Sequence, residues 1–116
     1  MTQILEEQKF DSKIIEREAL QILEDFQAIN IVKRDLPHSC SYADTIIIAT
    51  GRSSRQMASI ADAIKKELSK HLTYRIQIEG LEKAEWVLID LGNIIIHLFK
   101  EEIRAFYQLE KLWDHD

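Results

Sequence analysis

Residues 45–56 read TIIIATGRSSRQ, and this stretch predicts a buried strand that leads directly into a capped helix. The β-branched run 45–49 is typical of a strand in the interior of a sheet. Ser53 and Gln56 have the spacing of a capping box, in which each side chain satisfies a free backbone N–H of the first helical turn. Apolar residues then recur at helical spacing to about Lys70. The fold is therefore expected to contain a strand, a glycine turn and a helix in direct succession.

The same patterns predict two more helices and four more strands elsewhere in the chain. Apolar residues follow helical periodicity or strand alternation, and short polar or glycine-containing segments separate them. The expected helices cover 13–28, 53–70 and 101–113, and the expected strands cover 31–32, 45–49, 74–78, 86–89 and 94–99. The connection 90–93 is short and contains Gly92, which predicts a tight antiparallel hairpin.

This order of elements predicts a single α/β domain over residues 1–116, with 1–11 flexible. The sheet is expected to be mixed, with about five strands and about three helices, because a helix separates the second strand from the third. Three strands are continuous apolar runs, as in a sheet that is covered on both faces. If the helices pack mainly on one face, part of the other stays apolar and exposed, which usually marks an interaction surface. Helices distributed over both faces would remove that surface.

The composition favours a protein partner over nucleic acid. The chain has 20 acidic and 15 basic residues, a net charge of −5, whereas binding to phosphates relies on Lys and Arg. Such a charge suits a basic protein partner drawn in by long-range attraction. The single cysteine, Cys40, cannot form an internal disulfide. With no signal peptide, transit peptide or apolar run of about 18 residues, the protein is expected to be cytoplasmic.

Several blocks of the sequence resemble the ribosomal silencing factors, also called the Iojap-related family. The blocks span residues 19–113 in the family's order, and no single one would be specific alone. They are YADTIIIATGRSSRQ at 42–56, IAD at 60–62, EG at 79–80 before a Trp-led strand, DLGN at 90–93, HLF at 97–99 and RAFYQLEKLW at 104–113.

The resemblance implies a mixed-sheet α/β fold that is related to the nucleotidyltransferases but lacks their chemistry. It implies a non-enzymatic translational repressor without a cofactor. Such a repressor binds the large ribosomal subunit through large-subunit ribosomal protein fourteen and hinders joining with the small subunit, mainly under nutrient limitation. A homodimer is also implied, whereas no membrane contact and no direct nucleic-acid binding beyond incidental rRNA contact are expected. The family commonly has Asp where this chain has Asn93; an exposed charge pair lost there is worth at most about 1 kcal/mol.

The expected contact surface lies around Trp86. This residue follows an acidic, partly apolar segment, and a large aromatic side chain ringed by charges is typical of an interface hot spot. The predicted partner-binding residues are Glu79, Gly80, Leu81, Trp86, Asp90 and Leu91. In the alternative, Trp86 fills the core, as is expected of Trp113.

An enzyme is the competing hypothesis. The turn at Gly51 could hold the phosphate of a nucleotide with backbone N–H groups and two arginines, but it lacks the spacing of known phosphate loops. Asp44 and Asp90 could pair as metal ligands or as acid and base; a turn or capping role is expected for Asp44. His97 is expected to be a core or rim residue hydrogen-bonded to a neighbour. No catalytic, cofactor-binding or metal-binding residue is predicted.

A third hypothesis is an adaptor that binds RNA through basic residues of the second helix. The residues concerned are Arg52, Arg55, Lys65 and Lys66. The acidic net charge of the chain counts against it.

Overall fold

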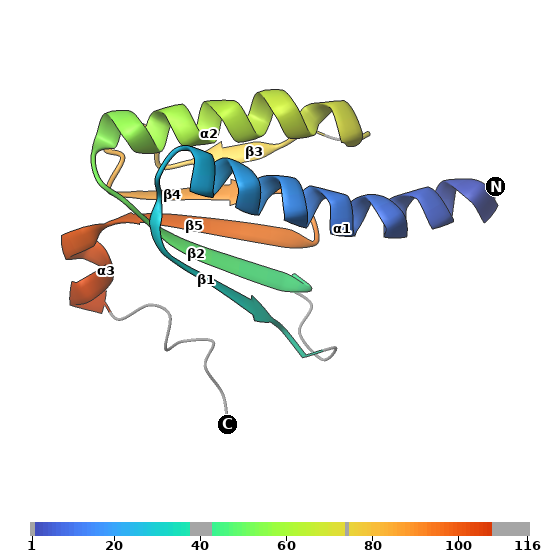
Figure 1. Ribbon diagram of the computed structural model, residues 1–116, viewed down its shortest axis with the longest axis horizontal. Helices are drawn as coiled ribbons and strands as arrows, with labels where there is room; N and C mark the ends of the chain where they lie inside the picture. Colours follow the sequence, from blue (N-terminus) through green and yellow to red (C-terminus); the bar gives the residue numbers. More distant parts are fainter. Residues whose placement is uncertain (1, 38–42, 74, 108–116) are drawn as a thin grey trace.

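The computed structural model describes residues 2–37, 43–73 and 75–107 of the chain. These residues form a five-stranded sheet in the order β1-β2-β5-β4-β3, together with three α-helices and a short 3-10 helix (Figure 1). The elements are α1 (Thr2–Asp25), β1 (Ile29–Asp35), β2 (Thr45–Gly51), α2 (Ser54–Leu68), η1 (Ser69–His71), β3 (Gln77–Glu79), β4 (Trp86–Asp90), β5 (Ile94–Lys100) and α3 (Glu101–Tyr107).

The predicted fold class is confirmed. The two central strands, β2 and β5, are parallel, and every other neighbouring pair is antiparallel. A parallel pair needs a long connection, and the chain between β2 and β5 carries α2 over the sheet before it returns through β3 and β4. The hairpin predicted around 90–93 joins β4 to β5, with Gly92 at φ 92° in its turn.

The ends of several elements differ from the predictions. Helix α1 begins at Thr2 rather than at residue 13 and ends at Asp25 rather than at 28. It ends in a Schellman motif, because the Ala28 N–H donates to the Leu23 carbonyl at 2.9 Å and Gln27 takes a left-handed φ of 65°. The flexibility expected for residues 1–11 stays a prediction. The predicted end of the last helix at residue 113, and with it Trp113, lies outside the described residues.

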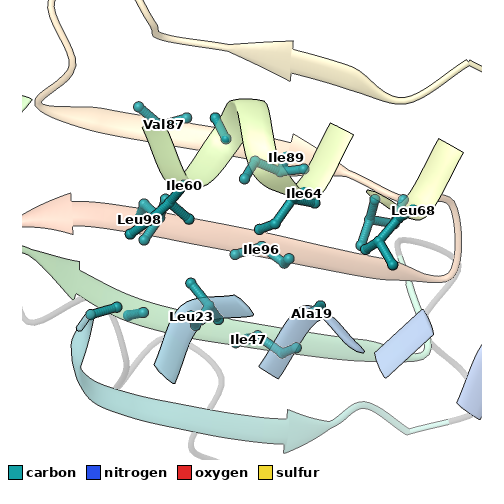
Figure 2. Close-up of a cluster of buried hydrophobic side chains, with 14 of the residues drawn as sticks. Ala19, Leu23, Ile47, Ile60, Ile64, Leu68, Val87, Ile89, Ile96 and Leu98 are labelled. Atoms are coloured by element: carbon teal, nitrogen blue, oxygen red, sulfur yellow. The ribbon is translucent and has the colours of Figure 1, made fainter. Parts of the chain in front are cut away.

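The first two helices cover the same face of the sheet and bury the larger core against it (Figures 1 and 2). Side chains that alternate along β2, β4 and β5 point toward these helices, as strand geometry requires. Full burial of one such side chain stabilises the fold by roughly 1.5–3 kcal/mol. The labelled members of this core are Ala19, Leu23, Ile47, Ile60, Ile64, Leu68, Val87, Ile89, Ile96 and Leu98.

The opposite face of the sheet holds a smaller cluster around Ile46, Ile48, Ile95 and Phe99, against which Ile103 of α3 packs. A buried arginine of the same helix, Arg104, donates to the Thr50 hydroxyl at 2.8 Å and to the Asn30 carbonyl at 2.5 Å. These bonds fix α3 over the ends of β1 and β2.

The helices are therefore distributed unevenly over the two faces. Two of them cover one face, while α3 lies at the β2 and β5 part of the other. On that second face, strand β4, which lies between β5 and the edge strand β3, begins with Trp86, whose side chain is exposed. This uneven distribution matches the expectation that part of one face stays apolar and exposed.

Gln56 ties the start of α2 to the end of α1, beyond its predicted role in a capping box. The Ser53 hydroxyl caps the helix as predicted, accepting from the Gln56 N–H at 3.1 Å. The Gln56 side chain accepts from the Arg52 N–H at 2.5 Å, not from that of Ser53, and it donates to the Phe26 carbonyl at 2.7 Å. The side chain therefore joins the two helices that cover the core.

We expect Gln56→Ala to lower the free energy of unfolding by about 1 kcal/mol, because it removes two hydrogen bonds that are partly open to water. Urea denaturation measures this change. Gln56→Glu is the matched control, since it keeps the acceptor for Arg52 but lacks the donor to Phe26 and should fall between the two. An alanine variant as stable as the wild type would show that water replaces both bonds without loss.

Candidate partner-binding site

Trp86 is an exposed aromatic side chain on the sheet face that α1 and α2 leave uncovered, with 41% of its surface exposed. In the β4–β5 ladder it lies directly opposite Phe99, and the two ring centroids are 4.9 Å apart with an interplanar angle of 46°. Phe99 itself is fully buried. One side of the indole therefore rests on the core while the other faces solvent.

His97 supports the same indole. The Trp86 Nε1–H donates to Nδ1 of His97 at 3.0 Å, and His97 stacks on Phe99 at 5.8 Å with an interplanar angle of 2°. His97 is only 2% exposed, and burial lowers the pKa of its imidazole from 6.5 to about 4. The prediction of a core histidine that is hydrogen-bonded to a neighbour is confirmed.

A groove of about 650 Å³ opens beside Trp86. Its lining contains three carboxylates and one ammonium group, and Leu81 places an exposed aliphatic side chain in it. The groove thus combines apolar surface with an excess of negative charge. Its lining residues are Ile78, Glu79, Gly80, Leu81, Glu82, Lys83, Glu85 and Trp86.

Gly80 shapes this groove by its backbone. Its φ is 90°, and its carbonyl accepts the Ala84 N–H at 2.9 Å, which folds the intervening residues into a compact turn. A Cβ atom at Gly80 would lie 2.1 Å from the Trp86 carbonyl oxygen. Only glycine permits this close approach of the loop to β4. The approach keeps both Leu81 and Trp86 in the lining of the groove.

The structure brings together four of the six predicted partner-binding residues, Glu79, Gly80, Leu81 and Trp86. Asp90 lies at the far end of β4, on the same face as Trp86 by strand alternation. Its carboxylate accepts the Gly92 N–H at 2.8 Å, so it also stabilises the hairpin turn.

Leu91 is the exception among the predicted contacts. Its side chain is 2% exposed and belongs to the core beneath α1 and α2. The side chain is therefore not available to a partner in this conformation, and Leu91 is removed from the contact surface. Its position next to Asp90 in the chain does not indicate this burial.

The competing phosphate site has little support at the Gly51 turn. The N–H groups of Arg52 and Gln56 are already bonded within the turn, to the side chains of Gln56 and Ser53. The other side of the turn is filled as well, because a Cβ atom at Gly51 would collide with the side chain of Met57. The structure favours a capped helix start.

Neither Asp44 nor Asp90 belongs to a described group of three or more His, Cys, Asp or Glu side chains that could hold a metal ion. The Asp44 backbone N–H donates to the Asn93 carbonyl at 2.8 Å, which ties the start of β2 to the hairpin. Across 2–37, 43–73 and 75–107, no three His, Cys, Asp or Glu side chains are grouped so that they could hold a metal ion. Cys40 lies outside these ranges.

Within the described ranges, no helix has the length and apolar character needed to cross a membrane.

Comparison with protein families gives a match over nearly the whole chain. Residues 9–116 match the family model described as "Ribosomal silencing factor during starvation". The chain is 42% identical over 104 residues to ribosomal silencing factor RsfS of Zymomonas mobilis, covering 90% of this chain and 78% of that protein. It is 34% identical to RsfS of Bacillus subtilis, covering 89% and 87%. It is 32% identical to the Iojap-related mitochondrial protein of Arabidopsis thaliana, covering 83% and 54%.

Solved structures agree with this match. A crystal structure of a Chromobacterium violaceum protein superimposes with a TM-score of 0.79 at 32% identity, covering 87% of this chain and 84% of that one. A second, from Bacillus halodurans, gives a TM-score of 0.70 at 34% identity, with coverages of 87% and 94%. Members of the matched family are ribosome-binding factors and not enzymes, which confirms the predicted absence of an enzymatic role. The chain belongs to the ribosomal silencing factor family.

Proposed function

We propose that this protein is a translational repressor of the bacterial cytoplasm, active mainly under nutrient limitation. It binds the large ribosomal subunit through large-subunit ribosomal protein fourteen and so hinders joining with the small subunit. Its family membership supports association with the large subunit. The observation that carries the choice of surface is the exposed indole of Trp86 beside an acidic groove.

The proposed contact surface, called here the Trp86 patch, consists of Glu79, Gly80, Leu81, Trp86 and Asp90. Its charge suits arginine and lysine side chains of a basic ribosomal protein, because complementary potentials steer association and suppress wrong partners. Trp86 supplies the anchor, since a large aromatic ring that becomes desolvated on binding contributes more than the surrounding polar contacts.

The proposed repression does not require a catalysed reaction. A protein bound where the large subunit meets the small one occupies space that the small subunit requires. Binding to the large subunit and joining of the subunits are then mutually exclusive. The extent of repression follows from affinity and concentration alone.

We expect the double variant Trp86→Ala, Asp90→Lys to bind isolated large ribosomal subunits at least about a hundredfold more weakly than the wild type. The first change removes the anchor, and the second reverses an attractive charge. Co-sedimentation measures binding, and light scattering of mixed subunits measures joining. The wild type should slow joining, whereas the double variant should not. Circular dichroism checks that the fold is kept.

The matched control is Phe26→Ala, Asp62→Lys, which also removes an exposed aromatic ring and reverses an exposed carboxylate, at residues of the α1–α2 layer. It should bind like the wild type. A folded double variant with wild-type affinity would remove the Trp86 patch from the proposal. The mass of the free protein is measured first, because the homodimer that we also propose would change the apparent affinity.

A further inference from the structure

The exposed anchor of the Trp86 patch is held by a buried residue that cannot itself touch a partner. We infer that His97 is a positioning residue for partner binding, whose Nδ1 lone pair fixes the orientation in which Trp86 presents its indole. This inference rests on the proposed function, because it assigns a role within the same surface. The distance of 3.0 Å from Trp86 Nε1 to His97 Nδ1 and the burial of His97 carry it.

An indole at this place needs directional support. Trp86 is the first residue of β4, and the side chain of Glu85 just before it is exposed. Contact with Phe99 at 4.9 Å is apolar and tolerates rotation of the ring. A hydrogen bond prefers a nearly linear donor and weakens steeply when bent. The bond to His97 therefore selects one orientation among those that Phe99 would accept.

His97 is well suited to be the fixed half of this pair. It is buried on the central strand β5, and its ring stacks on Phe99 with nearly parallel planes. Burial lowers the pKa of the imidazole to about 4, so the ring is neutral at pH 7. A neutral imidazole can leave Nδ1 as an acceptor, whereas a protonated one would present two donors and lose the bond to the indole.

Positioning of this kind strengthens binding without adding a contact. A partner that has to order a mobile indole loses affinity, because immobilising a side chain on binding costs free energy. With His97 in place, this ordering has already happened in the free protein. Removing the acceptor should therefore weaken binding by about fivefold to tenfold, well short of the loss that follows from removing Trp86.

Two substitutions separate the acceptor from the bulk of the side chain. His97→Leu keeps an apolar filling but has no acceptor, and we expect its dissociation constant for isolated large subunits to rise by about fivefold to tenfold. His97→Asn places an amide oxygen near the position of Nδ1 and should stay within about twofold of the wild type. His71→Leu, at an exposed histidine paired with Glu18 on α1, is the matched control and should have no effect.

Nuclear magnetic resonance of the free protein gives a readout that does not depend on the ribosome. In wild-type protein the Trp86 indole N–H should exchange slowly with water, and the His97 ring should be in the neutral Nε2–H form. In His97→Leu the indole exchange should be fast, and in His97→Asn it should again be slow. A Trp113→Phe background leaves Trp86 as the only tryptophan.

The outcomes distinguish this inference from the proposed function. If wild-type protein fails to bind large subunits, the proposed function fails, while the indole exchange still shows whether His97 orients Trp86. A fast-exchanging indole in the wild type would overturn the inference, even if His97→Leu did not fold. Equal loss of binding in folded His97→Leu and His97→Asn would also overturn it, because the acceptor would then be irrelevant.

Discussion

A Gly80→Ala variant is expected to lose about 2–4 kcal/mol of stability, the largest effect of any single methyl group that we predict for this protein. Two terms add. Alanine at the φ of 90° observed here is strained. In addition, its Cβ would lie 2.1 Å from the Trp86 carbonyl oxygen and 3.4 Å from the Val87 Cα. These atoms are backbone of β4, so they cannot move aside without disturbing the sheet.

Thermal unfolding of Gly80→Ala should show a fall in Tm of roughly 10 °C for a domain of this size. Gly92→Ala is the matched control, because Gly92 has nearly the same φ, 92°, in an exposed hairpin turn at the other end of β4. Gly92→Ala introduces the same backbone strain at a positive φ but no collision with Trp86, and it should lose about 1 kcal/mol of stability. Equal losses in the two variants would mean that the loop moves freely away from β4, and the groove would then not be a fixed feature.

The sequence predicted best those elements whose signals are local. The cap of α2 lies in four consecutive residues that begin at Ser53, and the β4–β5 hairpin follows from two apolar runs around Gly92. The end of α1 was missed by three residues because Gln27 adopts a left-handed conformation that usually signals glycine. A glutamine at such a position cannot be recognised as a helix end from the sequence.

Strand β3 shows where periodicity stops being sufficient. The alternation over 74–78 predicted a strand, but the ladder covers only Gln77–Glu79. Gln77 pairs with Asp90, which is the last residue of β4, so the residues before Gln77 have no partner in that strand. Pairing is decided by the length of the neighbouring strand, which the alternation of one segment cannot report. Tyr74 itself lies outside the described residues.

The candidate site was only partly predictable for the same reason. The acidic and aromatic residues near Trp86 were visible in the sequence, and the hairpin register that places Trp86 opposite Phe99 follows from the short connection. Whether Trp86 would be exposed could not be decided, because that depends on how three helices distribute over two faces. Its hydrogen bond to His97 depends both on the β4–β5 register and on the sheet face that the two side chains share, and no sequence pattern indicates this pairing.

Leu91 was predicted to lie in the contact surface from the family resemblance and the makeup of the segment around Trp86, and the burial of its side chain counts against that prediction. At the end of a hairpin, consecutive residues turn toward different faces. Asp90 stays at the surface with its carboxylate on Gly92, whereas Leu91 enters the core. Proximity in the chain is thus a poor guide to a shared surface wherever a strand is about to reverse.

Acidification from pH 7 to pH 5 is expected to remove about 2 kcal/mol of stability through His97 alone. Burial lowers the pKa of His97 from 6.5 to about 4 in the folded protein, while the unfolded chain keeps the ordinary value. Between these two values the unfolded chain binds a proton that the folded chain does not bind. The free energy of unfolding therefore falls as the pH falls. The stabilisation is fully present above pH 6.5 and is lost by about pH 4.

Urea denaturation of wild type and His97→Asn at both pH values isolates this contribution. All other ionisable groups are shared by the two proteins, so their effects cancel in the difference between the two free energies of unfolding. Between pH 7 and pH 5, the free energy of unfolding of the wild type should fall by about 2 kcal/mol more than that of the variant. A difference that is the same at both pH values would mean that folded His97 titrates like an exposed histidine. Its imidazole would then reach water, and the buried acceptor that orients Trp86 would not exist in solution.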